Sequence, residues 1–157
     1  MSANHAASLQ YHAEGWAVAL AKDCAAAVRT IHLSALSLVP PTPNGHGSWP
    51  ELWRALQAAA SRGVYVHVWL PAPQPAHPAT RGNIGAGRAC AEAGINIHYV
   101  QGPRLLHAKT AVIDGTILFV GSGNFTAAAA HHNHEHYLRA DCPAIAQQIV
   151  LRLLSLA

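Results

Sequence analysis

The chain has 157 residues, a length that buries roughly two-thirds of its unfolded surface and suits one globular domain over residues 1–157. Hydrophobic residues make up 51% and charged residues 11%, a balance that excludes an intrinsically disordered chain. The formal net charge of +3 is well below the strongly basic profile of a protein that binds DNA mainly by charge.

Two further classes are disfavoured by the arrangement of apolar residues and cysteines. No segment reaches the roughly 20 consecutive apolar residues of a membrane span, and residues 1–10 are too polar and small for a secretory signal. The three cysteines are widely spaced and form no Cys-x-x-Cys, so we interpret them as reduced thiols. A cytoplasmic protein is expected.

The first hundred residues alternate between expected strands and expected helices. Strands are predicted over residues 9–14, 31–39, 64–70 and 95–100, and helices over residues 16–29, 48–61 and 84–93. Pro-rich loops interrupt the pattern at residues 40–47 and 71–83. Ser48 is expected to cap the second helix, with Glu51 completing a capping box.

The remaining third of the chain begins with a hairpin. Asp114-Gly115 separates two apolar runs, residues 106–113 and 116–120, which is a strong hairpin signal. A short Ala-rich helix, a strand over residues 134–139 and a helix over residues 143–156 follow. Helices that alternate with buried strands predict an α/β fold, an α-β-α sandwich whose mixed central β-sheet is flanked by helices.

The chemistry-bearing residues are concentrated around this hairpin. His107-x-Lys109-x4-Asp114 places a potential nucleophile and a fixed cation on the same face of a strand, a pair suited to phosphate. Gly121-Ser122-Gly123-Asn124 and Asn133-x-Glu135 follow. The His-x-Lys pattern by itself is weak in a chain with twelve histidines, but the three motifs together are specific.

These motifs, together with the order of elements, resemble the phospholipase D superfamily, and in particular its single-motif branch of small bacterial endonucleases. The resemblance implies a phosphodiesterase that needs no metal or cofactor and forms a covalent phosphohistidine. Members use two His motifs, whereas this chain has one. It therefore implies a homodimer in which two copies of His107 meet across a two-fold axis, one as nucleophile and the other as general acid and base.

The resemblance also assigns roles to individual residues. It implies that the catalytic residues are His107, Lys109, Asn124 and Glu135, and that the substrate-binding residues are Ser122, Gly123 and Arg104. Glu135, expected on a strand and facing away from His134 and His136, would orient the histidine. Asp114 is expected to be structural, at the hairpin turn and on the opposite face from His107.

Simpler readings of the same residues remain open. Asp114 is also the ordinary first residue of an Asp-Gly turn, and Glu135 is also compatible with a surface position on a strand. Imidazoles at i and i+2 can share a metal ion, so His131, His132, His134 and His136 suggest a metal site, against the metal-free chemistry that the resemblance implies.

Two departures from the family pattern bear on the substrate. His136 follows Asn-x-Glu, where the family commonly has Asn, and few basic residues lie near the motif (Arg81, Arg104, Arg139). The leading hypothesis is a nuclease that cleaves short or single-stranded DNA or RNA. The alternatives are a phospholipid hydrolase or transferase, a catalytically silent binding or scaffold domain, and the nuclease part of a larger defence or repair assembly.

Overall fold

A computed structural model describes residues 8–156. Most of the segment in which no secretory signal is expected, residues 1–7, lies outside the described residues. The elements of the described chain are β1 (Leu9–His12), α1 (Trp16–Ala26), β2 (Thr30–Ser34), α2 (Ser48–Ser61), β3 (Tyr65–Pro71), α3 (Asn83–Glu92), β4 (Asn96–Val100), β5 (Thr110–Ile113), β6 (Ile117–Gly121), α4 (Ala127–His131), β7 (Tyr137–Asp141) and α5 (Pro143–Leu154).

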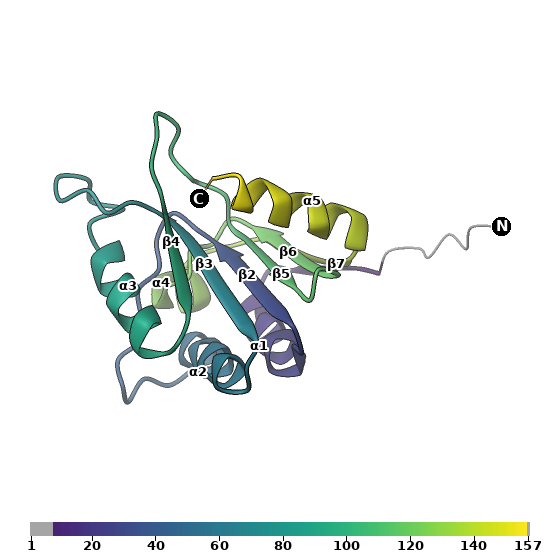
Figure 1. Ribbon diagram of the computed structural model, residues 1–157. Coiled ribbons are helices and arrows are strands. Elements are labelled where there is room, and N and C mark those ends of the chain that lie inside the picture. The colour runs from purple at the N-terminus through teal and green to yellow at the C-terminus, as the bar shows by residue number, and fades with distance from the viewer. Residues whose placement is uncertain (1–7, 157) are drawn as a thin grey trace.

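The strands form one mixed sheet in the order β1-β7-β6-β5-β2-β3-β4. β2, β3 and β4 pair in parallel through helical crossovers, whereas β5, β6, β7 and β1 pair antiparallel. In Figure 1, α1, α2 and α4 lie on one side of the sheet and α5 lies on the other. The predicted α/β fold with a mixed sheet and flanking helices is confirmed.

The two faces of the sheet are covered unequally. The main core lies under α1 to α4 and contains large buried side chains, among them Trp16, Trp49, Phe119 and Phe125. On the other face, α5 packs on β5 and β6, and Leu153 buries Trp69 in a smaller cluster. No helix among residues 8–156 is long and apolar enough to cross a bilayer.

Two local predictions in the first half are wrong. The apolar run 31–39 leaves the sheet after Ser34, because Leu38 is buried by a single bridge to Phe125 instead of by strand pairing. Ser48 does not cap α2, because the helix already includes it and its N-cap is Gly47. Gly47 has φ +100, and a Cβ there would lie 2.7 Å from the ring of His131, so glycine is required.

Two further predictions fail beside the motifs. β5 begins at Thr110 and β7 at Tyr137, so the expectation that His107, Lys109 and Glu135 lie on strands is wrong. Each residue lies in an irregular segment that leads into a strand. In the segment of His107, a side chain takes the place of strand pairing at one backbone group, because the Ser34 hydroxyl donates to the Ala108 carbonyl at 3.4 Å.

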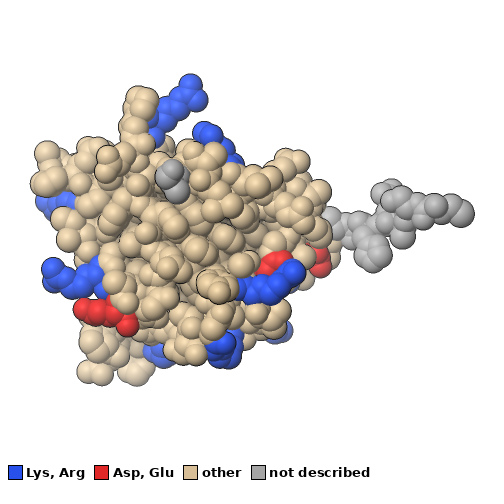
Figure 2. Space-filling view, in the orientation of Figure 1, with Lys and Arg blue, Asp and Glu red and all other residues tan. Residues whose placement is uncertain are grey.

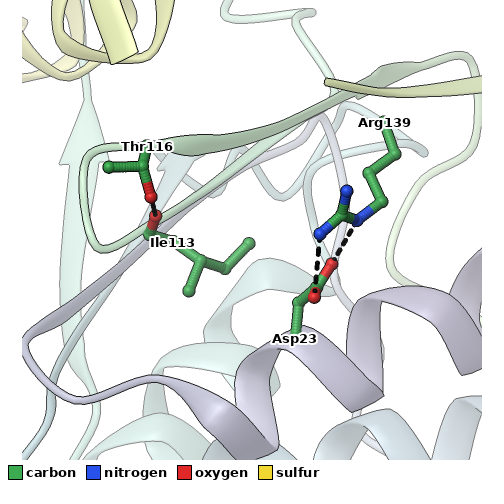
Figure 3. Close-up of polar contacts among 4 residues, drawn as sticks. All are labelled: Asp23, Ile113, Thr116 and Arg139. Carbon is green, nitrogen blue, oxygen red and sulfur yellow. Dashed lines mark hydrogen bonds and ion pairs between the residues drawn. The ribbon is translucent and has the colours of Figure 1, made fainter. Parts of the chain in front are cut away.

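Charge on the described surface is sparse and scattered. Figure 2 shows Lys and Arg as separate small patches on a largely uncharged face. The ion pair Arg139–Asp23 joins β7 to α1, with N–O distances of 2.6 and 3.1 Å and both side chains 16% exposed (Figure 3). The hydrogen bond to the Asp23 carboxylate raises the pKa of Arg139, and the negative charge of Asp23 adds to this effect.

Candidate active site

The three motifs meet at one edge of the sheet. Ser34 at the end of β2 pairs with Thr110 at the start of β5, and Gly121 at the end of β6 pairs with Tyr137 at the start of β7. The segments around His107, Ser122 and Glu135 therefore emerge side by side at the carboxyl edge of the parallel strands. Ligands of open α/β sheets bind at this edge.

His107 and Lys109 are in direct contact. The Lys109 Nζ lies 3.0 Å from Nδ1 and 3.2 Å from Nε2 of His107, and it donates to the His107 carbonyl at 2.7 Å. Because the in-plane directions of the two ring nitrogens diverge, an ammonium nearly equidistant from both lies over the face of the ring. The His107 side chain is exposed, so its ring edge faces solvent while Lys109 holds its face.

Lys109 is a buried cation, 6% exposed. Burial lowers its pKa, and the negative charge of Glu135 opposes that shift. A phosphate oxygen beside His107 would add a second compensating charge. The arrangement therefore supplies a fixed positive charge whose environment favours an anionic ligand.

Glu135 is held at both carboxylate oxygens. Oε2 accepts from the Ser122 hydroxyl, and Oε1 accepts from the Asn133 side-chain amide at 3.1 Å. Ser122 in turn accepts from the His136 backbone N–H at 3.1 Å. Gly123 allows this packing, because a Cβ there would lie 3.2 Å from the Glu135 carboxyl carbon.

The expected partners of Glu135 and Ser122 differ from the observed ones. Among the described residues, no hydrogen bond joins Glu135 to His107; the nearer charged group is Lys109, whose pKa responds to Glu135. Ser122 was expected to contact substrate, but its hydroxyl is engaged by Glu135 and His136. In this protomer Ser122 positions the carboxylate.

Asn124 bridges the site to the β2–α2 loop. Its Oδ1 accepts from the backbone N–H groups of Leu36 and Ser37 at 3.2 and 3.3 Å. Two donors on one side fix the orientation of the amide, so its NH₂ group points away from them as a remaining donor. The amide is thus suited to stabilise an anionic oxygen.

The short Ala-rich helix expected after the Gly-Ser-Gly-Asn turn is α4. α4 starts at Ala127 and is capped by the Thr126 hydroxyl, which accepts from Ala129 N–H at 3.2 Å. The turn itself is supported from the core, because the buried Tyr137 hydroxyl donates to the Gly123 carbonyl. Burial, with a smaller contribution from Glu135, raises the pKa of Tyr137 and keeps it a donor. Its position two residues after Glu135 was the one sequence signal for this residue.

Asp114 lies away from this edge. It has φ 52 in the hairpin turn, and its carboxylate accepts from Val28, Arg29 and Thr30 N–H at 3.0, 2.8 and 2.9 Å. Burial raises the pKa of Asp114, but these donors and the Arg29 charge outweigh it and leave the pKa lowered. The carboxylate therefore joins the hairpin to the α1–β2 junction at the opposite end of β5 from His107.

A cavity of about 480 Å³ opens beside the histidine. His107 and Arg104 are part of its wall, and the remaining lining, from the β4–β5 loop, the sheet and α5, is mostly apolar, including Val100, Leu105, Leu106, Ile145, Ile149, Leu153 and Leu156. Arg104 is exposed at the rim, and Arg152 of α5 also lines the cavity. An anionic group with an apolar substituent would fit this wall.

The four clustered histidines do not converge. His131 contacts Ser48 and Trp49, whereas His136 bonds to Tyr11. Among residues 8–156, no three His, Cys, Asp or Glu side chains are grouped as ligands of one cation. The arrangement gives no support to a metal shared by these histidines.

Comparison with known proteins places these features in a family. Residues 24–155 match the family described as "Cardiolipin synthase, PLD-like domain". Mitochondrial cardiolipin hydrolase of Xenopus tropicalis is 37% identical over 94 residues, which are 60% of this chain and 42% of that protein. The Homo sapiens protein of the same name is 36% identical over 91 residues, 58% of this chain and 34% of that protein. The matches thus span less than half of these relatives.

Solved structures share the fold. The phospholipase D family member Nuc from Salmonella typhimurium superposes with a TM-score of 0.75 at 24% identity, covering 96% of this chain and 93% of that one. NucT from Helicobacter pylori superposes with a TM-score of 0.73 at 18% identity, covering 96% and 94%. Because the family match extends over most of the chain and contains all three motifs, the chain belongs to the phospholipase D-like (PLD-like) domain family.

Proposed function

We propose that this protein is a metal-independent phosphodiesterase, a homodimeric nuclease that cleaves short or single-stranded nucleic acid through a phosphohistidine at His107. The observation that carries the proposal is the exposed His107 ring with the buried Lys109 ammonium on its face, 3.0 and 3.2 Å from its nitrogens. A nucleophile next to a fixed cation suits attack on an anionic phosphodiester.

The proposed reaction has two displacements. A ring nitrogen of His107 attacks phosphorus, the bond to the leaving oxygen breaks, and that oxygen takes a proton from His107 of the partner subunit. The partner subunit's His107 then removes a proton from water, the water oxygen attacks phosphorus, and the phosphorus–nitrogen bond breaks. Lys109 and the Asn124 amide would stabilise the charge that builds on the non-bridging oxygens.

The second subunit is required by this chemistry. One His-x-Lys motif supplies a nucleophile but no separate acid for the leaving group. A two-fold axis beside His107 would supply this acid from a second copy of the same chain.

The test combines a variant with a trapped intermediate. His107→Ala should abolish cleavage of single-stranded DNA and RNA while the fold and the dimer persist, and His46→Ala, a change of an exposed loop histidine, should have no effect. Brief reaction of the wild type should attach to His107 the phosphate together with the nucleotide or oligonucleotide that remains esterified to it, detected by mass spectrometry. Cleavage by His107→Ala, or full activity of a strict monomer in native mass measurements, would refute the mechanism.

A phospholipid hydrolase or transferase is the second candidate, and the apolar cavity beside His107 favours it. The same phosphodiester chemistry could place an acyl chain against Leu105 and Ile149. Phosphatidylcholine and cardiolipin vesicles should be assayed in parallel with single-stranded oligonucleotides. Faster turnover of a lipid than of every oligonucleotide would replace the nuclease assignment.

The remaining proposals concern context. We place the protein in the cytoplasm, supported by three free cysteines, of which Cys24 and Cys90 are buried. Membership of a larger defence or repair assembly would supply the sequence specificity for which no reader motif is evident. Loss of cleavage in the His107→Ala test would also exclude a catalytically silent scaffold, since such a domain has no activity to lose.

A further inference from the structure

An unusual aromatic pair lies at the same edge of the sheet as the active site. The Tyr11 hydroxyl bonds to His136 Nδ1 at 2.5 Å, the ring centroids are 5.8 Å apart and the planes differ by 22°. Atoms of two face-to-face rings cannot approach so closely, because van der Waals contact holds such faces about 3.5 Å apart. The two rings are therefore joined through this hydrogen bond with their planes 22° from parallel, and together they present one broad aromatic surface.

This surface is open. Tyr11 is 59% exposed, and His136 is also exposed. Side-chain alternation puts Tyr11 on the face of the sheet that α5 covers, but α5 packs on β5 and β6, away from the edge strand β1. The backbone at this pair is nevertheless held in place, because the backbone N–H of His136 donates to the Ser122 hydroxyl, which in turn donates to Glu135.

A row of cross-strand neighbours connects the pair to the nucleophile. Thr110, which lines the cavity beside His107, pairs with Val120, Val120 pairs with Leu138, and Leu138 pairs with Tyr11. The row contains an open apolar strip, since Val120 and Leu138 are 41% and 45% exposed, and it ends at Thr110, which is 7% exposed. Three strand spacings make its length about 14 Å.

We propose that Tyr11 and His136 form a stacking platform for a base of a single-stranded nucleic acid whose scissile phosphate lies at His107. The inference rests on the proposed nuclease function and names the residues that bind the substrate beside the cleavage site. A broad aromatic surface with polar atoms along its seam matches a nucleobase, whereas an acyl chain needs no planarity. Stacking would also supply the affinity that a net charge of +3 cannot supply through phosphate contacts alone.

The test compares base-bearing and abasic substrates. Wild type, Tyr11→Ala and Tyr11→Phe are assayed on a single-stranded oligothymidylate and on an abasic oligonucleotide of the same length. Tyr11→Ala should raise KM for oligothymidylate about tenfold with little change in kcat, and should not alter KM for the abasic strand. Tyr11→Phe keeps the ring and loses the hydrogen bond, so its KM for oligothymidylate should lie between the values for wild type and Tyr11→Ala. Tyr65→Ala, a change of a 68% exposed tyrosine on β3, is the matched control.

The failure of each claim has its own signature. No cleavage of either strand by the wild type would refute the nuclease function and the platform together. Cleavage with equal KM for Tyr11→Ala and wild type would refute the platform alone, as would a loss confined to kcat. A Tyr11→Ala variant that becomes monomeric would instead assign the pair to the subunit interface, and slower turnover confined to phospholipid would assign it to a lipid.

Discussion

Substitution of Asp114 by Asn should destabilise the fold without removing the chemistry. Asn tolerates the positive φ of 52 at this position and retains one oxygen, so the change isolates the carboxylate charge. The retained oxygen can still accept from Arg29 and Thr30, but its amide nitrogen would face the Val28 N–H. Two charge-assisted bonds become neutral and one is lost.

The magnitude follows from these three bonds. Charge-assisted bonds contribute about 1.5–3 kcal/mol and neutral ones about 0.5–1.5 kcal/mol, and partial exposure of the turn reduces both. We expect a loss of about 2 kcal/mol in the free energy of unfolding, which corresponds to about 4–8 °C in Tm for a domain of this size. Asp141→Asn, which changes an exposed aspartate at the end of β7, is the matched control and should be neutral.

The pH dependence provides a second check. Because the pKa of Asp114 is lowered in the folded state, its stabilisation is present above the unfolded value of about 3.9 and is lost as pH falls through the lower folded value. Urea unfolding followed by circular dichroism should therefore show the difference between wild type and variant at pH 7, and show it shrink below pH 4. Equal stability at pH 7, or a hundredfold loss of turnover in fully folded variant, would refute a structural role.

Three further outcomes are expected from residues around the sheet. Gly121→Ala should lower the free energy of unfolding by about 1–3 kcal/mol in thermal unfolding, because the new Cβ would lie 2.5 Å from the Tyr137 ring. Gly82→Ala is the control and should be neutral in the same measurement, because a Cβ there meets open space. Burial and the neighbouring histidines of β3 and β4 lower the pKa of His32 to about 4. Because the unfolded chain then binds a proton that the folded chain does not, the free energy of unfolding should fall by about 2 kcal/mol between pH 7 and pH 5. A His32→Gln variant should show a weaker dependence of stability on pH. Arg139→Met should lose about 2 kcal/mol in urea unfolding, because it leaves the carboxylate of Figure 3 unpaired; unchanged stability would mean that solvent replaces the pair.

Local patterns in the sequence determined the order of the elements. Apolar runs bounded by Pro and Gly located β2, β3 and β4, and Asp114-Gly115 located the hairpin, because turn chemistry and strand periodicity act over a few neighbouring residues. The boundaries were less accurate. The run after Ser34 is apolar because the loop packs against Phe125, a residue far along the chain, and no local pattern reports that.

The motif residues were likewise identifiable from sequence, but their partners were not. Spacing brought His107, Lys109, Asn124 and Glu135 into one hypothesis, and the fold does gather their segments at one edge. The hydrogen bonds that orient them join residues far apart in the chain: Asn124 accepts from Leu36 and Ser37. Such contacts depend on how the strands are ordered in the sheet.

The sequence by itself thus determined the family and, through its single His-x-Lys motif, the expectation of a second subunit. Only the tertiary structure decided that Ser122 holds Glu135, and that Tyr11 from the first strand lies beside His136. The physical reason is that β1 pairs with β7, a contact across 125 residues that sequence periodicity cannot encode.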